Sequence, residues 1–227
     1  MTTYDRFQGR AALRPAIDYS EPKPLLRGWS HALAALAAVV FTAAMLARAS
    51  DTARLIGALV FGLSMILLYS VSALYHRYHW EGREFKLLTA LDHANIFIMI
   101  AGTYTPFCLL VLGGLGITLL AVVWLLASAG MCGCSHAVHL PRWATVAQYI
   151  GLGSIALAIL PSLAAALPPQ AIGTLLLGGG VYALGGLVYA LRWPDPLPDV
   201  FGFHEIFHLL VVAGNICTAA VVWLWVL

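Results

Sequence analysis

The chain has 227 residues, of which 61% are hydrophobic and only 10% are charged. Soluble domains carry about 25% charged residues, so this composition excludes an ordinary soluble protein and indicates one that lives in a bilayer. The formal net charge of +2 is too small to suggest a nucleic-acid-binding protein. The cysteines are too few, and lie in sequence too apolar, to predict a disulfide framework; they are Cys108, Cys132, Cys134 and Cys217.

Apolar runs long enough to cross a bilayer recur seven times along the chain. A helix needs about 20 apolar residues to cross roughly 30 Å of hydrocarbon. We therefore expect an all-α membrane protein, a seven-helix transmembrane bundle forming a single domain over 25–227. The preceding polar tail, 1–24, lacks the apolar core and cleavage site of a signal peptide. The expected spans are about 27–48, 53–76, 87–111, 115–133, 143–165, 171–191 and 203–226.

The basic residues fall unevenly between the two sides of this bundle. With the N-terminus in the cytoplasm, ten Lys and Arg residues lie in inside segments, and only Arg48 and Arg54 lie outside. Cytoplasmic loops are enriched in basic residues. We expect the N-terminus to be cytoplasmic and the C-terminus to lie outside the cell.

The last span opens with two histidines four residues apart, His204 and His208. Residues at this spacing lie one turn apart on the same face of a helix, so both imidazoles can reach one metal ion. The rest of the span is almost wholly apolar. An ionisable group inside a span indicates a functional site, because hydrocarbon penalises it.

Three predicted spans bring ionisable groups to the same cytoplasmic depth. The second span ends with Ser72 and His76, the third carries Asp92 about one turn inside the boundary, and the seventh starts with the histidine pair. Three histidines and a water form an open, catalytic type of zinc site. We expect His76, His204 and His208 to bind zinc. Asp92 could take a proton from the water or anchor it, and Ser72 could stabilise an oxyanion.

Each of these residues also has a simpler explanation. A histidine near a span end can be interfacial, Asp92 could pair with Arg77 or Lys86, and Ser72 could serve helix packing. Glu205, between the two histidines, is expected to face away from them and to pair with a cytoplasmic Arg or Lys.

Other candidate ligands are weaker. His79 lies in a charged loop, and His93 is rotated about 100° from Asp92 around a helix. A cluster of soft-metal donors follows the fourth span, but its spacing matches no structural zinc pattern; its members are Cys132, Cys134, His136 and His139.

The His-Glu-x-x-His pattern is also a zinc-protease signature, in which Glu is the general base. Here it opens the last span, and no obvious carboxylate ligand follows it. An intramembrane zinc protease is therefore a rival interpretation, and it requires Glu205 to be indispensable.

Three segments, on spans two, three and seven, carry a resemblance to a known family. They are Ser72-Ala-Leu-Tyr-His76, the stretch from Leu91-Asp92-His93 to Thr105-Pro106, and His204-Glu-Ile-Phe-His208-Leu. With them the chain resembles the bacterial hemolysin III branch of the progestin and adipoQ receptor family. The resemblance implies a multi-pass protein of the bacterial plasma membrane. It also implies zinc bound by His76, His204 and His208, with Ser72 and Asp92 in a hydrolytic site shared with alkaline ceramidases.

We expect from these arguments a zinc-dependent membrane hydrolase that acts on a lipid amide or ester, such as a ceramide-like lipid, with the lipid bilayer as its other partner. The alternative is a non-catalytic hemolysin-like sensor, pore or transporter in which zinc is structural. The sequence does not fix the lipid or the oligomeric state.

Overall fold

The computed structural model describes residues 23–134 and 141–227, and this part of the chain is helical with no β-strand. Within these residues six helices are long and apolar enough to cross a membrane, and the number is seven when a bent pair is taken as one span. The helices are α2 (Trp29–Arg48), α3 (Thr52–Arg77), α4 (Gly82–Leu110), α5 (Gly113–Gly133), α6 (Arg142–Ala158), α7 (Leu160–Ala166), α8 (Pro169–Leu191) and α9 (Phe203–Val221), which continues into the π-helical turn η2 (Val222–Val226). The predicted seven-helix membrane bundle is confirmed.

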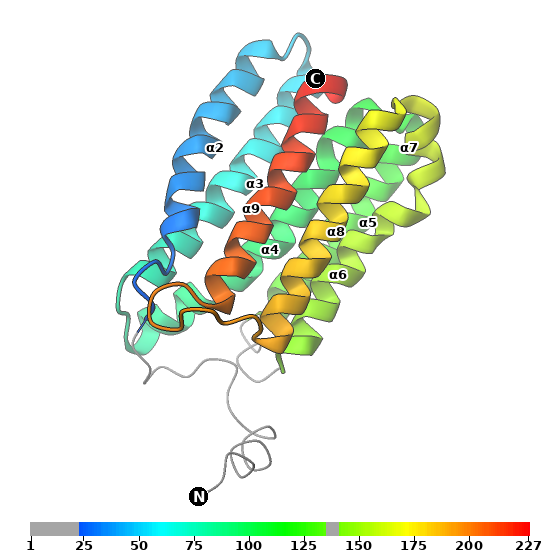
Figure 1. The fold of residues 1–227 in the computed structure, drawn as a ribbon. Coiled ribbons are helices and arrows are strands. Elements are labelled where there is room, and N and C mark those ends of the chain that lie inside the picture. Colours follow the sequence, from blue (N-terminus) through cyan, green and yellow to red (C-terminus); the bar gives the residue numbers. More distant parts are fainter. Residues whose placement is uncertain (1–22, 135–140) are drawn as a thin grey trace, which may run out of the picture.

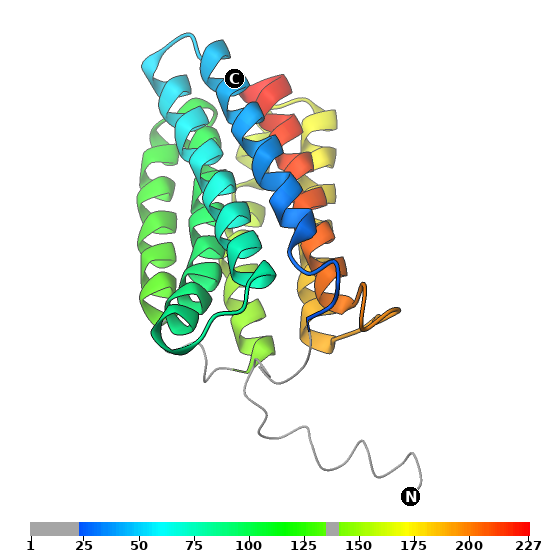
Figure 2. The same ribbon diagram turned by 90° about the vertical axis from the view of Figure 1, so that its left-hand side faces the viewer.

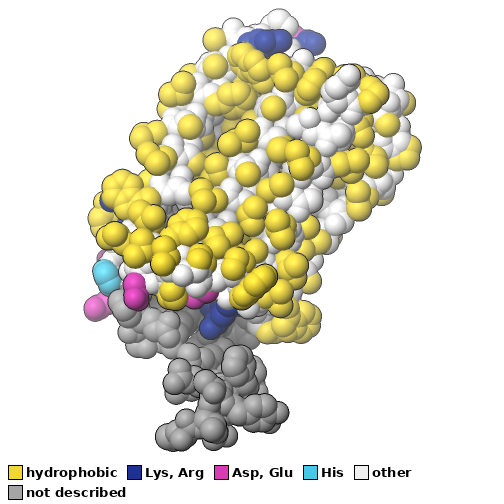
Figure 3. Space-filling view, viewed as in Figure 1, with side chains coloured by type: hydrophobic (Ala, Val, Ile, Leu, Met, Phe, Trp, Pro, Cys, Tyr) yellow, Lys and Arg dark blue, Asp and Glu magenta, His cyan; other side chains and the backbone are white. Residues whose placement is uncertain are grey.

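The helices lie side by side roughly along one axis, and α9 passes in front of α3 and α4 in the view of Figure 1, while α2 and α3 face the viewer in Figure 2. In the most apolar stretch of α4, 61% of the residues are buried, against 17% in α5. The visible face of the bundle is covered by hydrophobic side chains, and charged groups gather at its two ends (Figure 3). An apolar belt of this kind suits a protein whose flanks meet lipid.

Local chemistry explains where several helices begin. The carboxylate of Asp51 accepts a hydrogen bond from the backbone N–H of Arg54 at 2.9 Å and caps α3. Gly113 has a φ of +57°, which a glycine adopts without strain, and it allows α5 to follow α4 after only two residues. Pro169 occupies the first position of α8, where its missing N–H is not needed.

Two expected spans differ in detail from the structure. The fifth, predicted as continuous over 143–165, is broken by a bend of 51° between α6 and α7. Pro161, near the start of α7, cannot donate to the preceding turn, which favours a break there. The third begins at Gly82 rather than 87, because charged residues such as Glu84 can extend a helix beyond its apolar part. Asp92 thus lies ten residues into α4, nearly three turns from its start.

Candidate metal centre

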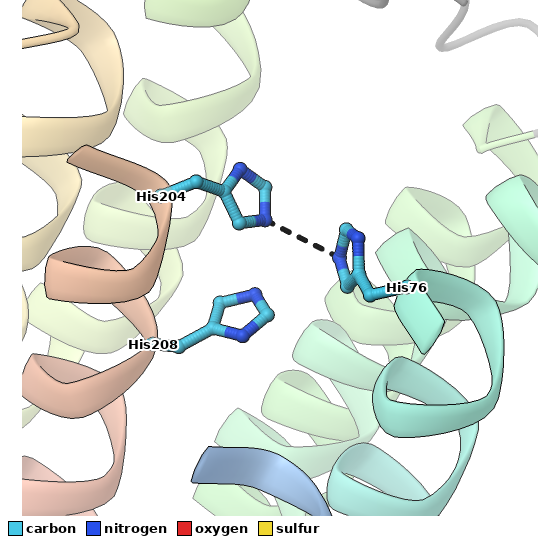
Figure 4. Close-up of side chains that lie close together, drawn as sticks. All are labelled: His76, His204 and His208. Carbon is cyan, nitrogen blue, oxygen red and sulfur yellow. Dashed lines mark hydrogen bonds between the residues drawn. The ribbon is translucent and has the colours of Figure 1, made fainter. Parts of the chain in front are cut away.

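Two helix ends bring the three predicted ligands together. His76 lies in the last turn of α3, and His204 and His208 lie in the first two turns of α9. All three imidazoles point into the space between these helices (Figure 4). One ring nitrogen from each histidine lies within 4.8 Å of the other two, although 128 residues separate His76 from His204. The structure therefore brings together the three histidines that the sequence singled out.

One pair of ring nitrogens has the spacing expected at a tetrahedral metal site. Nε2 of His76 and Nε2 of His204 are 3.2 Å apart. Nitrogens about 2.0–2.1 Å from a single zinc ion at tetrahedral angles lie about 3.3 Å from each other. His76 and His208 are buried and His204 is partly buried. Imidazole donors suit borderline transition metals, zinc among them.

Asp92 and Ser72 also lie beside this histidine cluster. Oδ2 of Asp92 is 3.6 Å from Nε2 of His76, and the Ser72 side chain interacts with the same carboxylate. Ser72 is only 2% exposed. Arg77, considered as a partner for Asp92, instead places its guanidinium 3.7 Å from the centroid of the Trp29 ring. A carboxylate and a hydroxyl therefore border the space between the three imidazoles.

Glu205 faces away from the histidines, and the expected pairing with a basic residue is confirmed. Nε of Arg27 donates a hydrogen bond to Oε1 of Glu205, whose side chain is only 3% exposed. The backbone N–H of Gly202 donates to Oε2 at 2.8 Å, so the same carboxylate caps α9. Both oxygens of Glu205 are thus engaged in holding the start of the last helix.

The weaker candidates lie apart from the cluster. His79 is exposed after the end of α3, and Nδ1 of His93 lies 2.7 Å from the carbonyl of Thr89. Cys132 is exposed, while the thiol of Cys134 donates to the carbonyl of Gly130. The other two members of the soft-metal cluster, His136 and His139, lie outside the described residues.

A fourth histidine, His31 in the first turn of α2, reaches the same cluster and was missed from the sequence. It is 2% exposed, and its ring stacks on that of His208 with the centroids 3.9 Å apart and the planes parallel. From the sequence, only three spans were expected to carry ionisable groups. The first span carries one as well, at the end of the bundle where the other three histidines lie, and the rule for buried ionisable residues could have found it.

Comparisons with known proteins agree with this architecture. The model of the family described as haemolysin-III related matches residues 19–219. Hemolysin-3 from Bacillus cereus is 40% identical over 157 residues, covering 69% of this chain and 68% of the relative. A hemolysin-3 homolog from Bacillus subtilis is 32% identical over 185 residues, covering 81% and 83%.

More distant matches extend to eukaryotic proteins. An adiponectin receptor protein from Drosophila melanogaster is 28% identical over 214 residues, covering 82% of this chain and 47% of the relative. These matches are consistent with the progestin and adipoQ receptor family. The bacterial relatives and the apolar helices indicate a multi-pass protein of the plasma membrane. The chain belongs to the haemolysin-III related family.

Proposed function

We propose that this protein is a zinc-dependent membrane hydrolase that cleaves a lipid amide or ester. The observation that carries the proposal is the buried cluster of three imidazole nitrogens within 4.8 Å of one another, bordered by a carboxylate and a hydroxyl. Three histidine ligands leave one position of a tetrahedral ion for water or substrate, which is the arrangement of catalytic zinc sites.

Each side chain has a distinct task in this scheme. His76, His204 and His208 hold the ion, which when bound supplies a Lewis acid and lowers the pKa of water toward ~7. The Asp92 carboxylate accepts the proton of the attacking water, and its contact with His76 keeps it beside the cluster. The Ser72 hydroxyl donates a hydrogen bond to the oxygen on which negative charge develops.

A lipid is the substrate class that suits these surroundings. The ligand helices α3 and α9 are long and apolar enough to span a membrane, and the face of the bundle seen in Figure 3 is apolar. A substrate held in the bilayer can reach such a centre between helices without crossing water. The expected orientation places the centre near the cytoplasmic side, and the resemblance to alkaline ceramidases favours a ceramide-like amide.

Metal analysis and lipid hydrolysis by the purified protein test this proposal. We expect about one zinc per chain, lost in His76→Ala/His208→Ala. Asp92→Asn should keep the zinc and lose at least ~100-fold in hydrolysis, because general-base catalysis typically contributes 10²–10⁴-fold. His79→Ala, which alters an exposed histidine just beyond α3, is the matched control and should change neither. Hydrolysis that survives removal of both the metal and Asp92 would end the proposal.

The names of the Bacillus relatives favour a second candidate, a hemolysin-like protein that alters membrane permeability with a structural metal. The same variants separate the two functions. A non-catalytic protein needs the metal ligands but neither the proton acceptor nor the oxyanion donor. Asp92→Asn and Ser72→Ala would then leave both zinc content and the permeability of cells or vesicles unchanged.

The engagement of Glu205 argues against an intramembrane zinc protease. That mechanism needs this carboxylate as a free general base. Here the side chain pairs with Arg27 and caps α9. Retention of zinc and hydrolysis in Glu205→Gln supports the lipid hydrolase, whereas loss of hydrolysis with zinc and fold intact supports the protease.

A further inference from the structure

The segment 23–28, which leads into α2, lies beside the histidine cluster and lines a pocket together with His76. Nζ of Lys23 donates to the carbonyl of Tyr78 at 2.7 Å, at the end of α3. The backbone N–H groups of Leu25 and Leu26 donate to carbonyls in the connection between α8 and α9, at 2.9 and 3.1 Å. Figures 1 and 2 show the segment, in dark blue, beside that connection, in orange. The start of α2 is thus tied to the end of α3 and to the connection that leads into α9.

Two residues of this segment and one residue in the first turn of α2 contact a predicted ligand or the residue next to one. Arg27 pairs with Glu205, the residue after His204. Gly28 approaches His76 so closely that a Cβ would lie 3.1 Å from the Cβ of that histidine. His31 stacks on His208.

His31 acts through the face of its ring. Neither ring nitrogen has a well-aligned hydrogen-bond partner among the described residues, so its defined contacts are those of the imidazole plane. One is the parallel stack on His208, and another is the ring of Tyr69, with centroids 5.1 Å apart. The Tyr69 hydroxyl accepts a hydrogen bond from Asn215 on α9 at 2.6 Å, which fixes this support. His208 is therefore packed between its own helix and a braced ring from α2.

We infer that the first turn of α2 is a structural wall of the metal centre and that His31 is a positioning residue, which holds the imidazole of His208 in its ligating orientation. His31 is not in the group of three whose nitrogens lie within 4.8 Å of one another, so it supports a ligand and is not one of the set. This inference rests on the proposed metal function and adds to it the device that fixes the ligand geometry.

Residues that orient metal ligands typically contribute 10–100-fold to metal affinity. We expect His31→Ala to weaken zinc binding about tenfold, measured by competition with a chromogenic chelator, and to alter the visible absorption spectrum of the cobalt-substituted protein. His31→Phe keeps an aromatic face against His208 and should restore most of the affinity and the spectrum. The spectrum reports ligand geometry, which a loss of packing elsewhere leaves unchanged.

Met45→Ala is the matched control, because Met45 is fully buried on the same helix but lies three turns or more from the histidines. It should lower thermal stability and leave the zinc affinity and cobalt spectrum as in the wild type. The inference is overturned if His31→Ala binds zinc like the wild type, if His31→Phe is as weak as His31→Ala, or if Met45→Ala weakens zinc equally. Weaker zinc binding in His31→Ala, in a protein that hydrolyses no lipid, would support this inference and overturn the proposed function. A wild type that binds no divalent metal overturns both.

Discussion

The two ends of the bundle use the same kind of ion pair in opposite ways. At the histidine end, which carries His31, His76, His204 and His208, Arg27 pairs with Glu205 across 178 residues, with side chains 20% and 3% exposed. At the opposite end, Arg54 pairs with Asp51 three residues away, with side chains 37% and 45% exposed. The first pair joins the turn before α2 to the start of α9 in a part-buried setting, and the second lies within one helix terminus in an exposed one.

This difference in burial predicts that the two ion pairs contribute very differently to the free energy of unfolding. An exposed pair is screened by water and typically contributes between 0 and ~1 kcal/mol. Breaking a buried pair leaves a charge without a partner, which costs several kcal/mol. The ion pair at the histidine end therefore helps to hold the start of α2 against the start of α9, whereas the other pair serves mainly as a helix cap.

The largest effect should come from Glu205→Gln. It leaves the partly buried Arg27 guanidinium without a counter-charge, which we expect to lower the free energy of unfolding by about 2 kcal/mol, less than for a fully buried pair. Thermal unfolding in detergent measures the loss. A double-mutant cycle with Arg27→Gln isolates the pair. A coupling energy near zero between Arg27 and Glu205 would show that this ion pair stabilises the fold no more than the exposed pair at the opposite end.

A smaller effect is expected from Gly28→Ala. Gly28 has a φ of +78°, which costs a residue with a side chain about 1–2 kcal/mol, and the new Cβ would press on His76. We expect lower thermal stability together with weaker zinc binding. Gly82→Ala is the control, because Gly82 also has a positive φ, of +55°, but a Cβ there meets nothing within 4 Å. Gly82→Ala should share the backbone strain and keep the wild-type zinc affinity. If both variants bound zinc equally weakly, the inference that the first turn of α2 is a wall of the metal centre would be contradicted.

The smallest effect is expected from Asp51→Ser at the opposite end. Serine retains a capping oxygen for α3 and removes only the exposed ion pair, so the unfolding midpoint at neutral pH should not shift measurably. The backbone N–H of Arg54 holds the pKa of the Asp51 carboxyl below its ordinary value. Its contribution to stability is therefore present above the ordinary carboxyl pKa and is lost as the pH falls through the lowered value. In unfolding scans from neutral to acidic pH, the wild type should therefore show a small fall in stability that Asp51→Ser does not show.

The sequence alone determined the class of fold and most of the candidate site. Apolar runs of about 20 residues are sufficient to predict membrane helices, because hydrocarbon requires every backbone polar group to be paired within the segment. The spacing of His204 and His208 is a local property of a helix, so it too was visible in the sequence. Depth in the membrane then suggested that His76, Asp92 and Ser72 share the same layer.

Only the tertiary structure decided which helices at that depth are neighbours. Depth is one coordinate, and the position of a helix around the bundle depends on packing between segments far apart in the chain. For this reason the sequence could propose the meeting of α3 and α9, but gave no sign that α2 brings His31 onto His208. The bend between α6 and α7 likewise depends on packing as well as on a proline. Periodicity along one helix is local information, and contact between helices is not.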